Sequence, residues 1–176
     1  MQTRSIKEII EKGDEIINVE EKIKHLISSA WDIRRSFPKE SLELSLQARK
    51  IAEEHQLKND IAYSYRNTGT AYYILSQYSK ALVDLEKALV FFQGINDKHA
   101  IGSTLRNIGN VYHSMNLFEP SIELYNKAIE ITEAENDEQG TAYNLGNIGH
   151  VYQKMKKYDL AKDYLLRAKA ILENIN

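Results

Sequence analysis

The chain contains no cysteine, only two prolines and a formal net charge of only -2 over 176 residues. Without cysteine, disulfides and thiolate metal sites are excluded, which suits a reducing compartment. The near balance of 23 basic and 25 acidic residues argues against a phosphate-binding surface. No apolar run approaches the roughly 20 residues that span a bilayer, and the N-terminus lacks a signal-peptide core. We therefore expect a cytoplasmic protein whose partners include neither nucleic acid nor membrane.

One 40-residue unit recurs along the chain without insertion. The period relates Asn67, Asn107 and Asn147, then Gly69, Gly109 and Gly149, then Tyr72, Tyr112 and Tyr152, and continues through small residues at Ala81, Ser121, Ala161, Ala88, Ala128 and Ala168. An earlier, degenerate copy carries Ile27 and Ser29 in place of Asn and Gly, as expected for an end unit. The predicted organisation is an N-terminal cap helix in residues 1–18 and repeats at 19–58, 59–98, 99–138 and 139–176.

Each copy contains two runs in which apolar residues recur three and four positions apart, separated by short polar turns. This pattern predicts two amphipathic helices per copy, and hence an all-α array of antiparallel helix hairpins. Ser79 and Asp159 are predicted to cap second helices, and Pro120 to occupy a first helical position. Because a helix-interior Gly costs about 1 kcal/mol, Gly69, Gly109 and Gly149 are expected where two helices cross closely.

The spacing of the small residue, the aromatics and the alanines resembles the tetratricopeptide repeat. The 40-residue unit, as in LRNIGNVYHSMNLFEPSIELYNKAIEI, is similar to repeats of the Pins/LGN adaptors, the kinesin light chains and many bacterial signalling proteins. This resemblance implies a right-handed superhelical solenoid whose first helices line a concave, peptide-binding groove. The groove residues that it implies are Tyr63, Arg66, Asn67, Thr70, Tyr73, Ser103, Arg106, Asn107, Asn110, His113, Tyr143, Asn147, His150, Gln153 and Lys154.

These residue types suit a peptide that carries acidic or C-terminal carboxylate groups. Asn amides can hydrogen-bond an extended backbone whatever its sequence, and Arg66 and Arg106 offer forked donors to carboxylates. In the alternative, each repeated Asn bonds the neighbouring repeat and has no ligand. No arrangement of nucleophile and base or of phosphate-binding glycines occurs. No two of the five His lie three or four apart on one helix, although His113 and His150 could approach each other across neighbouring helices, so neither a metal nor a cofactor is expected.

The last helix carries apolar residues that a following repeat would cover, namely Leu165, Leu166, Ile171 and Leu172. Either the chain is a fragment or input module of a longer protein, or it pairs with itself through this face. The favoured function is a non-enzymatic adaptor or regulatory input, and the alternative is a dimerisation module with an empty groove. A third function, resembling bacterial response-regulator phosphatases and peptide receptors, would need an additional N-terminal helical bundle, for which only residues 1 to 18 remain.

Overall fold

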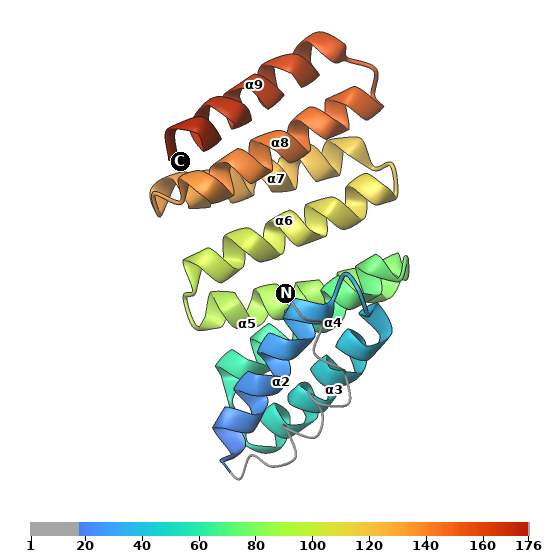
Figure 1. Ribbon diagram of the computed structural model, residues 1–176, viewed down its shortest axis with the longest axis vertical. Coiled ribbons are helices and arrows are strands. Elements are labelled where there is room, and N and C mark those ends of the chain that lie inside the picture. Colours follow the sequence, from blue (N-terminus) through green and yellow to red (C-terminus); the bar gives the residue numbers. More distant parts are fainter. Residues whose placement is uncertain (1–17, 176) are drawn as a thin grey trace. The chain divides into compact units, whose positions relative to one another are not determined.

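Eight α-helices make up nearly all of residues 18–175, which are the residues that the structure, a computed structural model, describes (Figure 1). No strand occurs within this range, so the all-α prediction is confirmed. The predicted cap helix falls outside the described residues, except for residue 18. The chain divides into two compact units, residues 1–95 and 96–176.

The first unit contains α2 (Val19–Ile33), α3 (Pro38–Glu54), α4 (Lys58–Ile74) and α5 (Tyr78–Gly94). Each helix packs on the next, and α2 also contacts α4. One face of each helix is apolar, and these faces meet in a core that includes Ile23, Leu26, Leu44 and Ile61. The first helices α2 and α4 are therefore neighbours.

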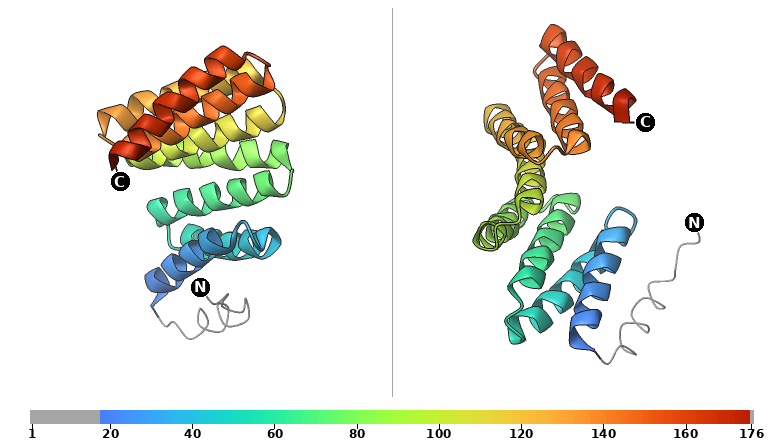
Figure 2. Two further views of the ribbon diagram at one scale, coloured as in Figure 1. Left: turned by 45° about the horizontal axis from the view of Figure 1, so that its top comes forward. Right: turned by 90° about the vertical axis from the view of Figure 1, so that its left-hand side faces the viewer.

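The second unit contains α6 (Lys98–Ser114), α7 (Phe118–Ala134), α8 (Glu138–Lys154) and α9 (Tyr158–Ile175). Within it α6 packs on α7, α7 on α8, and α8 on α9, while α6 also contacts α8. Figure 2 shows α8 and α9 running side by side in opposite directions. Tyr125, Ile148 and Val151 form its fully buried centre. As in the first unit, the two first helices, here α6 and α8, are neighbours.

Six of the seven turns between the described helices, all but the turn from α2 to α3, share one backbone conformation that recurs every 20 residues. A residue of positive φ, between 55° and 60°, stands at Gln56, Ser76, Asn96, Asn116, Asn136 and Lys156. The amide of the residue after it bonds a carbonyl five positions earlier, as from Gln77 to Tyr72 at 2.8 Å and from Lys157 to Tyr152 at 2.9 Å. This is the left-handed closure that commonly ends helices. Each 17-residue helix and its three-residue turn thus form half of the 40-residue repeat.

We expect Lys156→Gly to stabilise the protein by about 1 kcal/mol, because a left-handed backbone strains a side chain with a Cβ but not glycine. Thermal unfolding would show a higher midpoint. Asn136→Gly is the matched control, since Asn tolerates this conformation and the gain there should be much smaller. An equal rise of the unfolding midpoint in both variants, or no rise in Lys156→Gly, would show that the left-handed backbone at Lys156 is not strained.

The repeated glycines lie at contacts between the two helices of a hairpin, as expected. A Cβ on Gly69 would come within 2.7 Å of the Leu85 side chain, one on Gly109 within 2.7 Å of the Tyr125 ring, and one on Gly149 within 2.7 Å of Leu165. The partner is therefore the large residue 16 positions later. The small residue 12 positions later contributes its backbone, since the carbonyl oxygen of Ala81 would lie 3.1 Å from a Cβ on Gly69.

The predicted caps are wrong. The second helices α5 and α9 begin at Tyr78 and Tyr158, so Ser79 and Asp159 lie inside the first turn, and Pro120 is the third residue of α7. Side-chain caps precede the first helices α6 and α8 instead: the carboxylate of Asp97 accepts from the amide of Ala100 at 2.9 Å, and that of Asp137 from the amide of Gly140 at 2.8 Å. The first helix α4 has no such cap.

Candidate functional site

Two parallel stripes of polar side chains run along the neighbouring first helices of the second unit. Members of each stripe lie three or four residues apart and so share one side of their helix. None of these residues is fully buried. We call this surface the α6–α8 face; its residues are Ser103, Arg106, Asn107, Asn110 and His113 on α6, and Tyr143, Asn147, His150, Gln153 and Lys154 on α8.

A hydrogen bond between side-chain amides joins the two stripes. Nδ2 of Asn147 donates to Oδ1 of Asn110 at 3.1 Å, and the same oxygen accepts the hydroxyl of Tyr125 at 2.7 Å. Asn147 therefore bonds the neighbouring repeat, which is the role that the sequence offered as the alternative to ligand binding, and it holds the two first helices together. The bond also fixes the level at which α6 and α8 meet, and so aligns the residues one turn further along each helix.

Arg106 lies near the middle of the α6–α8 face. Its guanidinium is 5.9 Å from the centre of the Tyr143 ring, at the long end of a cation–π contact. Burial lowers the pKa of Arg106 from its usual value, and the negative charge of Asp137 opposes this shift. Arginine nonetheless stays protonated in proteins, so the residue supplies a fixed positive charge.

The C-terminal ends of α6 and α8 bring three basic groups together. His113 is half-buried, with its ring 6.2 Å from that of Phe118, whereas His150 and Lys154 are exposed. Burial lowers the pKa of His113 below its usual 6.5, and the positive charges of Lys154 and His150 lower it further. The pKa of His113 on α6 thus depends on basic side chains of α8 as well as on burial.

The predicted groove residues of the first unit are engaged within the protein to different degrees. Asn67 is only 2% exposed, and its Nδ2 donates to the carbonyl of Ile27 at 2.9 Å. The groove role expected for Asn67 is therefore corrected: the side chain ties α4 to α2 and has almost no surface left for a ligand. The hydroxyl of Thr70 donates to the carbonyl of Arg66 at 2.8 Å, and the Tyr73 ring packs 6.3 Å from that of Tyr78.

Arg66 lies among aromatic rings. Its guanidinium is 4.7 Å from the ring centre of Tyr63 and 4.9 Å from that of Trp31, and the Tyr63 ring meets Phe92 edge-on at 4.9 Å. Sequence reasoning missed Trp31 and Phe92, just as it missed Tyr125 beside Asn110. Their signal was present, since each is an aromatic residue at an interior helix position, but the period alone does not say which side chains meet.

An open hollow of about 390 Å³ lies between α8 and α9. It joins part of the α6–α8 face to part of the predicted self-association surface. Leu165 and Leu172 line it, whereas Leu166 is 54% exposed. Its lining residues are Ala142, Tyr143, Gly146, Asn147, His150, Leu165, Ala168, Lys169, Leu172 and Glu173.

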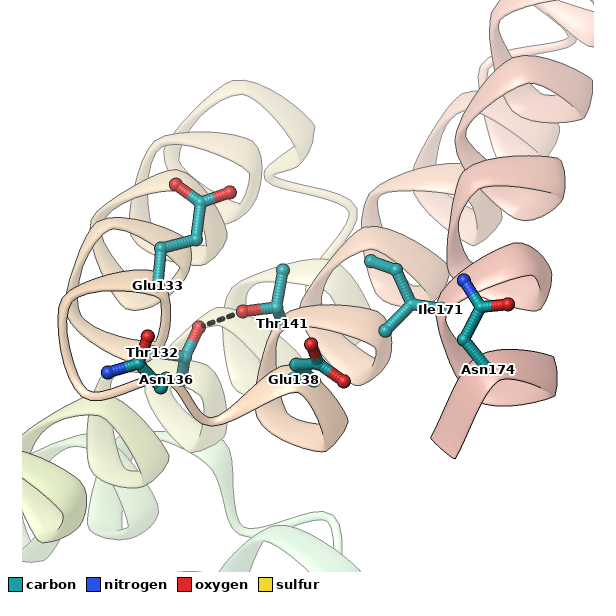
Figure 3. Close-up of a pocket in the computed structure, with 7 residues that line it drawn as sticks. All are labelled: Thr132, Glu133, Asn136, Glu138, Thr141, Ile171 and Asn174. Carbon is teal, nitrogen blue, oxygen red and sulfur yellow. Dashed lines mark hydrogen bonds between the residues drawn. The ribbon is translucent and has the colours of Figure 1, made fainter. Parts of the chain in front are cut away.

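Ile171 belongs to a different hollow, of about 310 Å³, at the opposite end of α8 from Lys154. Figure 3 shows it between α7, α8 and α9, with the hydroxyls of Thr132 and Thr141 hydrogen-bonded at 2.7 Å. Glu133 and Glu138 also line it, and none of its seven lining residues is basic. This hollow therefore does not suit an acidic ligand.

Among residues 18–175, no group of three or more His, Asp or Glu side chains is placed to hold a metal ion. In the same part of the chain, no helix is both long enough and apolar enough to cross a membrane.

Helix hairpins repeated at 40 residues, with side-chain stripes on neighbouring first helices, define a helical-repeat protein. The chain matches the tetratricopeptide repeat family over residues 60–134 and 100–174 and belongs to that family. The family predicted from the repeat is thereby confirmed. No curated protein sequence matches the chain.

Three solved structures illustrate the fold that this chain shares. The chain is similar to BtubC (BKLC) from P. vanneervenii, with a TM-score of 0.78, 20% identity, and coverage of 97% of this chain and 72% of that one. It is also similar to aspartyl phosphate phosphatase F from Bacillus subtilis, with a TM-score of 0.82, 22% identity, and coverage of 91% of this chain and 42% of that one. A Rap protein complexed with competence and sporulation factor is similar with a TM-score of 0.83, 21% identity, and coverage of 96% of this chain and 48% of that one. The chain thus spans less than half of the last two, and at these identities the likeness establishes the shared helical-repeat fold.

Proposed function

We propose that the protein is a non-enzymatic interaction module that holds an acidic peptide or acidic segment of a partner protein on the α6–α8 face. It would serve as an adaptor or regulatory input in the cytoplasm. Members of its family are generally scaffolds, and a Rap protein of the same fold has been solved in complex with a factor.

The distribution of charge between first and second helices carries this proposal. α6 contains no Asp or Glu, and α8 contains only Glu138, at its first residue. By contrast, α7 contains four Glu, at positions 119, 123, 130 and 133. A face that carries Arg106 near its middle and Lys154 at one end, and that is nearly free of carboxylates, attracts an acidic partner, because complementary potentials favour encounter and suppress basic competitors.

The hydrogen-bond donors of the face fit the same ligand. An Asn side chain has two N–H donors and a carbonyl acceptor, so the amides of Asn110 and Asn147 retain donors beyond the bond between them. Such donors can bond peptide carbonyls regardless of sequence, whereas Arg106 and Lys154 select carboxylates. We therefore expect recognition by charge and backbone rather than by a deep side-chain pocket.

The test is fluorescence anisotropy at pH ~7.5, where carboxylates are ionised, with two labelled octapeptides, (Asp-Ser)4 and (Lys-Ser)4. Wild type should bind the acidic peptide and not the basic one. Lys154→Glu should weaken binding about tenfold, since it reverses an exposed charge on the face. Lys162→Glu, at an exposed position of α9, is the matched control and should bind like wild type. Equal binding of both peptides, or equal loss in both variants, would leave the α6–α8 face without a role.

Self-association is the second candidate, favoured by the hollow between α8 and α9. One repeat earlier, the positions of Leu165 and Ala168 are occupied by Tyr125 and Ala128, which are fully buried in the part of the unit where α7 packs on α8. The corresponding surface of α9 is built to accept a helix. Light scattering should then give a dimer mass that Leu172→Glu, a change in the lining of the hollow, reduces to that of a monomer, and a monomer for wild type would dismiss this candidate.

A further inference from the structure

We propose that His113, His150 and Lys154 form a carboxylate-binding subsite at the end of the α6–α8 face, and that this subsite captures an acidic partner more tightly as the pH falls below neutrality. The inference rests on the proposed function, because it specifies where an acidic ligand is held and what controls its affinity.

The amide bond between the two first helices sets the geometry of this subsite. Asn110 and His113 are three residues apart on α6, and so are Asn147 and His150 on α8. Since Asn147 bonds Asn110 directly, the two histidines lie one turn beyond a shared level. Lys154 follows His150 by four residues and therefore stands on the same side of α8.

In the described part of the chain, α6, α7 and α8 bring no carboxylate against His113. Glu173 of α9 lines the same hollow as His150, but its carboxylate lies 3.4 Å from Nζ of Lys169 and is paired with it. α6 has no acidic residue, and the only one in α8, Glu138, is at the far end of that helix. From α7 the group that meets His113 is the ring of Phe118, and the first-turn Glu119 is exposed. The ionisable groups that act on His113 are Lys154 and His150, both basic. A ligand carboxylate would supply the missing negative charge.

Protonation then couples to binding with a definite sign. In the free protein, burial and the basic side chains of Lys154 and His150 lower the pKa of His113, so its ring is mainly neutral at pH ~7. A bound carboxylate favours the charged ring and raises that pKa, so binding takes up a proton. Affinity should therefore rise as the pH falls through about 6.5 and level off below the lowered pKa of the free protein.

Stability without ligand should change in the opposite direction. A histidine whose pKa is lowered by folding gives stability that is fully present above the unfolded value of about 6.5 and is lost as the pH falls through the folded value. Acidification thus weakens the free protein slightly while it strengthens the complex.

The experiment measures binding of rhodamine-labelled hexa-aspartate at pH ~7.5 and ~5.5, a range in which neither the label nor the side chains of the probe change charge appreciably. We expect roughly fivefold tighter binding at the lower pH for wild type, since a rise of one pKa unit on binding sets a limit of about tenfold that is not fully reached at pH ~5.5. The double variant His113→Gln, His150→Gln should bind about equally at both. His99→Gln, an exposed position at the other end of α6, is the matched control and should keep the pH dependence. Use of the probe as free acid and as C-terminal amide distinguishes a terminal carboxylate from side-chain carboxylates as the ligand.

A second readout needs no substitution: NMR titration of the His113 ring should show a higher pKa with hexa-aspartate than without it. Binding that is independent of pH, or pH dependence that survives in the double variant, would overturn the subsite while the proposed function stands. No binding at either pH would overturn both.

Discussion

Asp84→Ala should lower the free energy of unfolding by about 3 kcal/mol, the loss expected when one partner of a buried ion pair is removed. Oδ2 of Asp84 accepts the hydroxyl of Thr68 at 2.6 Å and lies 3.3 Å from Nη1 of Arg49. The side chains of Asp84 and Arg49 are only 11% and 20% exposed. Without the carboxylate, the guanidinium of Arg49 loses its ion pair and stays beside the ring of Tyr65, whose centre is 4.5 Å away. Urea unfolding would measure the loss.

The control is Asp163→Ala, which removes an exposed ion pair with Arg167 at 4.0 Å on α9. Exposed pairs contribute little, so this variant should unfold within about 0.5 kcal/mol of wild type. If both substitutions cost the same, the pair between α3 and α5 is not the buried network described here.

The second unit supplies the matched replacement for this network. Eighty residues after Arg49, Thr68 and Asp84 the chain carries Ile129, Ile148 and Tyr164, respectively. These three side chains belong to one apolar cluster. The triple variant Arg49→Ile, Thr68→Ile, Asp84→Tyr should therefore unfold at least as late as wild type, because a buried ion pair can be replaced by packed apolar groups without loss. A triple variant as unstable as Asp84→Ala would show that the two units do not share this packing.

Gly109→Leu should cost more than about 2 kcal/mol, since overpacking outweighs the gain in helix propensity over glycine. Even a Cβ would approach the Tyr125 ring to 2.7 Å. That ring cannot move aside easily, because it is fully buried and its hydroxyl is bonded to Asn110 at 2.7 Å. Thermal unfolding of the purified variant, with circular dichroism to confirm the helical fold, gives the measurement.

Two other glycines of the same unit serve as controls. A Cβ on Gly146 meets nothing within 4 Å, so Gly146→Ala should gain about 1 kcal/mol from helix propensity. Gly149→Ala meets Leu165, which is half-buried beside the hollow between α8 and α9 and can shift, so the change should be small. A Gly109→Leu variant that melts with wild type would show that the hairpin crossing is not tightly packed.

Repetition made the fold readable from the sequence, because a 40-residue period with two apolar helical stripes has few packed solutions. The same period located Gly69, Gly109 and Gly149 at helix contacts. It did not find the caps, since the helices begin at Tyr78 and Tyr158, earlier than the side chains of Ser79 and Asp159 suggested. Nor did it reveal the left-handed turns, because Gln, Ser and Lys stand there as well as Asn, and no glycine marks them.

The candidate site was only partly readable. The sequence determined that α6 and α8 carry Asn and His on one helical side, with no acidic residue in α6 and only Glu138 in α8, within a tetratricopeptide-repeat protein. Tertiary structure alone decided that Asn67 is buried against α2, that Asn147 bonds Asn110, and that His113 lies within the influence of His150 and Lys154. The physical reason is that periodicity fixes which side of a helix a residue occupies, whereas its burial, partner and pKa depend on the neighbouring helices that cover that side.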